Sequence, residues 1–149
     1  IRERHKCEYG YEDYIASLFN NILLLVSRQQ QNGENYTVTI PEEIEMAVSY
    51  FNENYNTKIS VAQYAESLHI STNWFIRNFK QHMMISPAQY LLSLRMVNAQ
   101  SLLENTDYSV GEIAEIVGYD NQLYFSRVFK KEYGISPKEY KELYAQKPQ

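Results

Sequence analysis

The second half of this 149-residue chain contains two copies of one pattern. The segment FKQHMMISPAQY at 79–90 returns as FKKEYGISPKEY at 129–140, with an offset of 50 residues. The segment VAQYA at 61–65 returns as VGEIA at 110–114 with an offset of 49, so the second copy has one extra residue between Ala114 and Phe125. Stacked repeat proteins need three or more repeats. Two copies therefore predict a duplicated small unit and not a solenoid.

Helix starts recur at matching places in both copies. In a capping box, a Ser hydroxyl accepts from a first-turn amide, and a Gln or Glu three residues later accepts from the Ser amide. Four such pairs are present: Ser60 with Gln63, Ser86 with Gln89, Ser109 with Glu112, and Ser136 with Glu139. Pro follows Ser86 and Ser136, and Pro is favoured at the first helical position. No segment alternates convincingly with period two, so we expect an all-α fold.

Each copy predicts two short helices separated by a tight turn. The four expected helices span 61–67, 72–82, 110–117 and 122–132. Ala65 and Ala114 are small at the points where the paired helices must cross closely. We expect two helix-turn-helix units at about 60–83 and 109–133, and leucines and Val97 between them predict a long connecting helix over 87–104.

Two further helices are expected ahead of the repeats. Apolar residues from Tyr11 to Val26 recur at three- and four-residue steps, which is typical of one face of a helix. A polar linker follows at 32–39. Pro41, followed by Glu42 and Glu43, predicts the start of the next helix, because Pro is tolerated there and acids favour the positive end of the helix dipole.

Charge is distributed unevenly along the chain. The net charge is −4, but residues 1–56 have a balance of −5 and residues 57–149 a balance of +1. Because local charge decides what a surface attracts, the repeats remain compatible with nucleic acid. The single cysteine, Cys7, excludes an internal disulfide and suits a reducing cytoplasm. No apolar run is long enough to span a bilayer, and the first residue, Ile1, leads us to expect a fragment of a longer protein.

The region from about Ser60 to Tyr140 resembles the DNA-binding domain of the AraC/XylS family of bacterial transcription regulators. The second copy carries the resemblance most specifically, from SVGEIAEIVGY at 109–119 through YFSRVFKK at 124–131 to GISP at 134–137. The resemblance implies homeodomain-like helix-turn-helix units that contact two successive major grooves of double-stranded DNA. It implies a cytoplasmic regulator without enzymatic activity or cofactor.

The resemblance also suggests how the rest of the chain is organised. In relatives, an N-terminal domain senses a ligand or mediates dimerisation. We therefore expect 1–38 to be the end of such a domain and 39–149 to be the DNA-binding domain. Residues 11–26 are candidates for homodimer contacts, and RNA polymerase is a further partner if the protein is an activator.

The second helix of each unit supplies the candidate DNA contacts. Phe75, Phe79, Phe125 and Phe129 are spaced to face the core. The outward residues of the first unit are Thr72, Asn73, Trp74, Ile76, Arg77 and Lys80; those of the second are Asn121, Gln122, Leu123, Tyr124, Ser126, Arg127, Lys130 and Lys131. Arg can bond guanine, and Asn or Gln adenine, through two hydrogen bonds. The lysines are expected to hold phosphates, which positions the protein without specifying sequence.

Two positions depart from the family pattern. Met84 stands where the second copy has Gly134, at a helix end that often needs positive φ. We therefore expect the first unit to end its second helix differently. Lys141 stands where the family often has Arg, which is acceptable if the role is a phosphate contact.

Other functions are less well supported by the sequence. The repeats could scaffold protein contacts in an interaction or dimerisation module. Some enzymes that repair alkylated DNA combine a similar DNA-binding module with a reactive cysteine, but Cys7 has no visible activating partner. His5, Cys7, His69 and His82 lack zinc-ligand spacing, so no metal site is expected.

Overall fold

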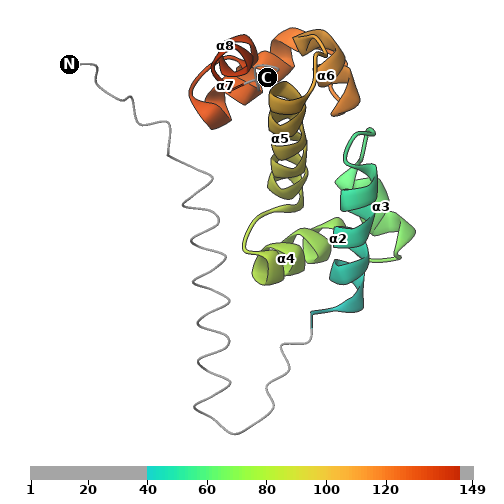
Figure 1. Cartoon of the computed structure of the whole chain (residues 1–149). Helices are drawn as coiled ribbons and strands as arrows, with labels where there is room; N and C mark the ends of the chain where they lie inside the picture. The colour runs from blue at the N-terminus through green and yellow to red at the C-terminus, as the bar shows by residue number, and fades with distance from the viewer. Residues whose placement is uncertain (1–39, 145–149) are drawn as a thin grey trace, which may run out of the picture.

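The computed structural model describes residues 40–144, and every regular element in this range is a helix (Figure 1). The helices are α2 (Glu42–Asn54), α3 (Val61–Ser67), α4 (Thr72–Met83), α5 (Pro87–Asn105), α6 (Val110–Ile116), α7 (Gln122–Tyr133) and α8 (Pro137–Tyr144). The all-α prediction is confirmed for this part of the chain. The expected helix over 11–26, the linker at 32–39 and Cys7 lie outside the described residues.

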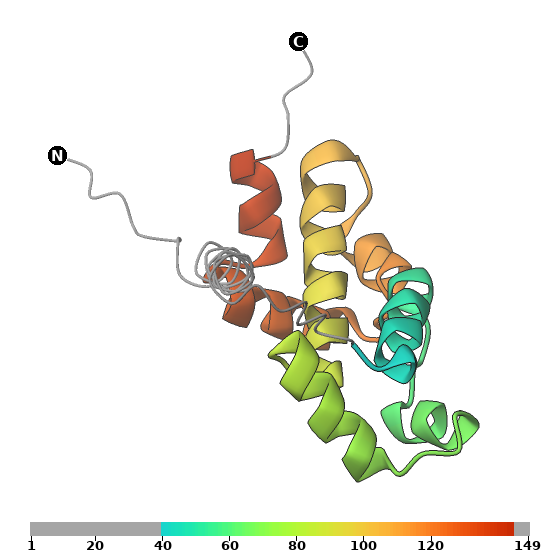
Figure 2. The same cartoon turned by 90° about the horizontal axis from the view of Figure 1, so that it is seen from below.

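The long helix α5 joins two separate groups of helices. In Figure 1, α2, α3 and α4 surround one end of α5, and α6, α7 and α8 surround the other. The turned view places α2 and α3 on one side of α5 and α7 and α8 on the other (Figure 2). The sequence predicted this connection over 87–104, and α5 extends one residue further.

Each group has its own hydrophobic core, and α5 contributes to both. In the first core, Phe51 of α2 packs against Phe75 and Phe79 of α4. In the second, Phe125 and Phe129 of α7 form the centre. All four phenylalanines of α4 and α7 are 0% exposed, so the prediction that they face the core is confirmed. Buried aromatic rings of this size supply much of the packing energy in so small a domain.

Capping explains where most helices begin. The boxes at Ser86, Ser109 and Ser136 make both reciprocal hydrogen bonds. Ser60 makes only half of its box, accepting from the Gln63 amide. At Glu139, the hydrogen bonds donated by the Ser136 hydroxyl and amide hold the pKa of the carboxyl below its usual value, because they favour the ionised form.

The expected difference between the two helix ends is wrong. Met84 follows α4 with φ 64°, and Gly134 follows α7 with φ 79°, so both ends turn through the left-handed region. The repeated fold requires this conformation, because the same ISP segment must start the next helix in both units. Met84 therefore adopts a backbone conformation that costs a non-glycine residue about 1–2 kcal/mol.

Candidate nucleic-acid interface

The two helix-turn-helix units share the same turn geometry. The Ile70 amide donates to the Ala65 carbonyl at 3.1 Å, and the Tyr119 amide donates to the Ala114 carbonyl at 2.8 Å. Both alanines are buried where the paired helices cross. These equivalent bonds follow the first helix of each unit, and α4 and α7 are the recognition helices of a duplicated arrangement.

The outer face of α4 carries four exposed candidates: Asn73, Ile76, Arg77 and Lys80. Thr72 is half-buried. Trp74 differs from the expectation that it faces outward, because it is partly buried and packs against the first core. Its size lets one edge reach the core while the rest remains at the surface, which helical spacing alone could not show.

The outer face of α7 is more completely exposed. Gln122, Leu123, Tyr124, Arg127, Lys130 and Lys131 are all exposed, and Ser126 is half-buried. Leu123 is 72% exposed, so it contributes little to packing within the described fold. The centroid of the Tyr124 ring lies 5.9 Å from that of Tyr119. Tyr124 is therefore supported by a buried residue of the turn.

Asn121 has a structural role that the sequence reasoning missed. Its side-chain Oδ1 accepts from the Tyr124 amide at 2.9 Å and so caps α7. Ser71 does the same for α4 by accepting from the Trp74 amide. The missed signal was the preference for Ser and Asn at the residue before a helix. The amide nitrogen of Asn121 is still able to donate to a base or phosphate.

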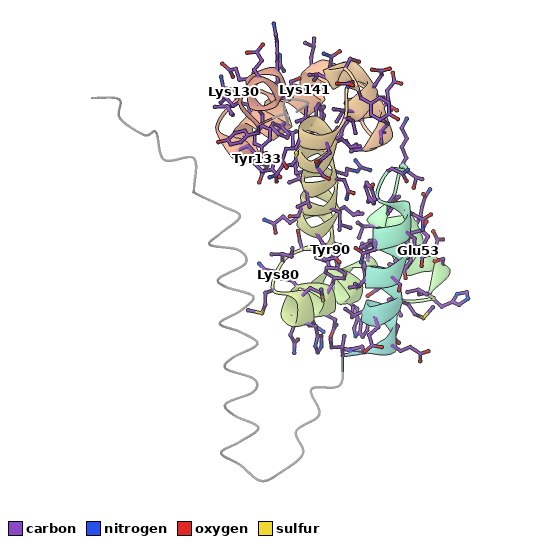
Figure 3. All side chains as sticks on the ribbon, in the orientation of Figure 1. Glu53, Lys80, Tyr90, Lys130, Tyr133 and Lys141 are labelled. Atoms are coloured by element: carbon purple, nitrogen blue, oxygen red, sulfur yellow. The ribbon has the colours of Figure 1, made fainter. Side chains whose placement is uncertain are left out.

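The basic residues on both recognition helices are available for anions. Figure 3 shows Lys80 and Lys130 on the same side of α5. Within residues 40–144, the one salt bridge joins Lys58 to Asp120, so neither lysine has an acidic partner within 4 Å there. The segment 72–84 contains no acid. Exposed positive charge without an acidic partner within 4 Å is what phosphate contacts require.

Lys141 is used within the fold. Its Nζ donates to the Tyr108 carbonyl at 2.6 Å and thus ties α8 to the loop before α6. One bond to the backbone leaves two further N–H groups of this ammonium, so the suggested phosphate contact stays a prediction.

Other kinds of site find little support in the described residues. Among residues 40–144, no group of three or more His, Cys, Asp or Glu side chains could hold a metal ion. None of the helices between residues 40 and 144 combines the length and the hydropathy of a membrane span. An open cleft of about 630 Å³ lies beside α7, and its lining includes Lys58, Arg95, Tyr119 and Arg127.

Two helix-turn-helix units carried on one shared helix define a class of bipartite helix-turn-helix domains. Residues 64–143 match the family described as "Helix-turn-helix domain", which is more than half of the chain. The chain belongs to this family, and its relatives are AraC-type transcription regulators.

The named relatives include an operon regulator and a transcriptional activator. The chain is 33% identical over 135 residues to the raffinose operon transcriptional regulatory protein RafR of Pediococcus pentosaceus, a match covering 84% of this chain and 49% of that protein. It is 34% identical to the transcriptional activator RhaR of Mannheimia succiniciproducens, covering 88% of this chain and 47% of that protein. The chain thus spans about half the length of these relatives.

Solved structures agree with this assignment. The C-terminal domain of AraT, a response regulator from Geobacillus stearothermophilus, superposes with a TM-score of 0.70 at 34% identity, covering 72% of this chain and 90% of that one. The DNA-binding domain of the transcriptional factor AdpA, solved in complex with a target DNA, has a TM-score of 0.65 at 29% identity, covering 68% of this chain and 92% of that one.

Proposed function

We propose that this chain is the DNA-binding part of a sequence-specific bacterial transcription regulator. The observation that carries the proposal is the duplication of an exposed recognition helix. Arg77 and Lys80 on α4 correspond to Arg127 and Lys130 on α7, and all four are exposed. The likeness to a domain solved with its target DNA supports the same function. A regulator that binds bacterial DNA would act in the cytoplasm, because the DNA lies there.

The residues divide into two roles. Arg77 and Arg127 would contact base edges or the adjacent phosphates, since a guanidinium can bond guanine through two hydrogen bonds. Lys80, Lys130 and Lys131 would contact phosphates. Because α5 joins the two units, α4 and α7 would enter successive major grooves, about 34 Å apart, on one face of the duplex.

The part of the chain before α2 is proposed to connect the domain to the rest of the regulator. We infer that residues 1–38 end a sensing or dimerisation domain, and that 11–26 take part in homodimer contacts. Support comes from the apolar stripe at 11–26, which contains two acids and no Lys or Arg, a charge balance that disfavours a place on DNA. RNA polymerase would be a further partner if the regulator activates transcription.

Footprinting on a selected duplex tests the proposal. Duplexes that bind the 149-residue chain are first selected from a random library. We expect protection of two adjacent major-groove segments per monomer, on one face. Affinity should also fall steeply with salt, because phosphate contacts release counterions. Binding that is insensitive to both sequence and salt would favour an interaction module instead. Protection of a single segment would mean that only one unit docks.

A further inference from the structure

The turn of the second helix-turn-helix unit lies against the first unit. Gly118 has φ +87°, and a Cβ added there would lie 2.6 Å from the Asn56 carbonyl oxygen in the loop after α2. Figure 1 shows this loop reaching toward the α6 end of the molecule. The equivalent residue of the first unit, His69, also has positive φ but is exposed. Glycine thus permits a backbone contact between the units that the first turn does not make.

The extra residue of the second repeat lies at the same contact. The Ile70 and Tyr119 amides make equivalent turn bonds. In the first unit the N-cap follows at once, whereas Asp120 intervenes in the second. The Asp120 Oδ2 lies 2.7 Å from Lys58 Nζ, in the loop after α2. Both side chains are largely exposed, so this pair contributes little by itself.

Arg95, on α5, contacts both units. Its Nε donates to the Tyr55 carbonyl and its Nη2 to the Thr57 carbonyl, each at 2.7 Å. Its guanidinium carbon lies 5.2 Å from the centre of the Tyr119 ring, within range of a cation–π contact. Because α2 ends at Asn54 with no basic residue in its last turn, Arg95 also supplies the cation favoured at a helix C-terminus.

We propose that Arg95 is a positioning residue, which holds α7 in one orientation relative to α4. The two cores share no residue, and each packs on its own end of α5. A single helix sets the distance between the units, but it is a second attachment away from the helix axis that restricts their rotation. Arg95 provides this attachment, with Gly118 allowing the close approach. The inference rests on the proposed binding of both recognition helices to one duplex.

A fixed orientation predicts a fixed spacing of the two half-sites. One added base pair rotates a half-site by about 35° about the DNA axis, since a turn takes 10–10.5 base pairs. A rigid pair of units cannot follow this rotation, whereas a loosened pair can. Arg95 should therefore control how strongly the protein discriminates between spacings.

The test compares spacings for matched variants of the full chain. The duplex selected from the random library is compared with versions carrying one base pair more or less between the half-sites. Arg95→Met removes the donors and keeps the aliphatic stem. Arg95→Lys keeps the charge, but one ammonium cannot bond both carbonyls in the same geometry. Lys138→Met is the control, because it removes one positive charge from an exposed position on α8.

The proposal predicts a change in a ratio of affinities. Wild type and Lys138→Met should both prefer the selected spacing. In Arg95→Met this preference should fall by about tenfold, within the range typical of coupling between sites. Arg95→Lys should not restore it fully. An unchanged preference, or an equal loss of affinity at every spacing, would overturn the positioning role, as would a wild type that is indifferent to spacing.

A measurement without DNA separates this inference from the proposed function. Spin labels are attached at Gln81→Cys on α4 and Glu142→Cys on α8, both exposed positions, with Cys7 replaced by Ser. The distance distribution should be narrow in the parent and broad in Arg95→Met. Equal widths would contradict the proposal even if DNA binding is demonstrated. A broader distribution in Arg95→Met, together with no specific DNA binding by the parent, would support the positioning role of Arg95 and refute the proposed function.

Discussion

At the scale of single residues, the two recognition helices share one arginine and one lysine at matched positions but differ elsewhere. Arg77 corresponds to Arg127, whereas Asn73 of α4 corresponds to Leu123 of α7. An amide and an aliphatic side chain favour different base edges. We therefore expect the two half-sites to have different sequences and the site not to be a direct repeat.

Removing either arginine should weaken specific binding. Arg77→Ala and Arg127→Ala should each cost about 1–3 kcal/mol on the selected duplex if they contact bases. Lys80→Ala is the control: it should weaken all sequences about equally and lower the slope of affinity against salt. Titrations on the selected duplex and on a scrambled one distinguish the two cases. An Arg127→Ala variant with unchanged affinity for both would show that α7 does not lie in the groove.

The exposure of Leu123 predicts an apolar contact with a thymine methyl group. Replacing the contacted thymine with deoxyuridine removes only that methyl. It should lower wild-type affinity about fourfold, as expected from ~0.8 kcal/mol for one buried methyl. Leu123→Ala should bind more weakly and no longer distinguish the two bases. Asn73→Ala, changed at the equivalent position of α4, should keep the distinction. If no thymine in the second half-site shows this effect in wild type, Leu123 does not contact a methyl group.

At the scale of helices, the ends are set by local chemistry and by the demands of the repeat. Ser and Asn caps begin α4 and α7, and a left-handed residue ends each. The second unit uses glycine at that end, as the conformation favours, while the first unit tolerates Met84. The two ends thus provide a matched pair for measuring backbone strain.

Substitutions at these two helix ends should change the stability of the fold in opposite directions. Met84→Gly should raise the free energy of unfolding by about 0.5–1.5 kcal/mol, because the relieved strain exceeds the added entropy of the unfolded chain. Met84 is 60% exposed, so the lost side chain removes little packing. Gly134→Ala should lower stability by a similar amount. Chemical denaturation measures both, and a destabilised Met84→Gly would show that the methionine side chain matters more than its φ.

At the scale of the whole molecule, the apolar segment that precedes the DNA-binding domain needs a surface to pack against. The stripe from Tyr11 to Val26 is too apolar to remain in water. We predict that the chain self-associates weakly through it. Sedimentation should show a concentration-dependent dimer that is lost in a chain beginning at Thr39, and in one with Leu18 and Ile22 replaced by Ser. A strictly monomeric chain at high concentration would instead indicate packing within one molecule.

The sequence by itself determined the helices, the duplication and the face of each recognition helix. Capping boxes, proline positions and four-residue phenylalanine spacing act within one or two turns, so they are visible in a linear chain. The helix starts, the buried phenylalanines and the exposed Arg77 and Arg127 followed from them.

Only the tertiary structure decided how the two units are held together. Arg95 lies about 40 residues from the carbonyls that it bonds, and Gly118 meets a loop near residue 56. Local periodicity carries no information on such contacts, because they depend on where folded elements meet. The repeated sequence likewise showed only that the second repeat has one extra residue within a range of positions. The hydrogen bonds of the two turns identified that residue as Asp120. The orientation of α7 relative to α4 therefore depends on long-range packing and not on any motif.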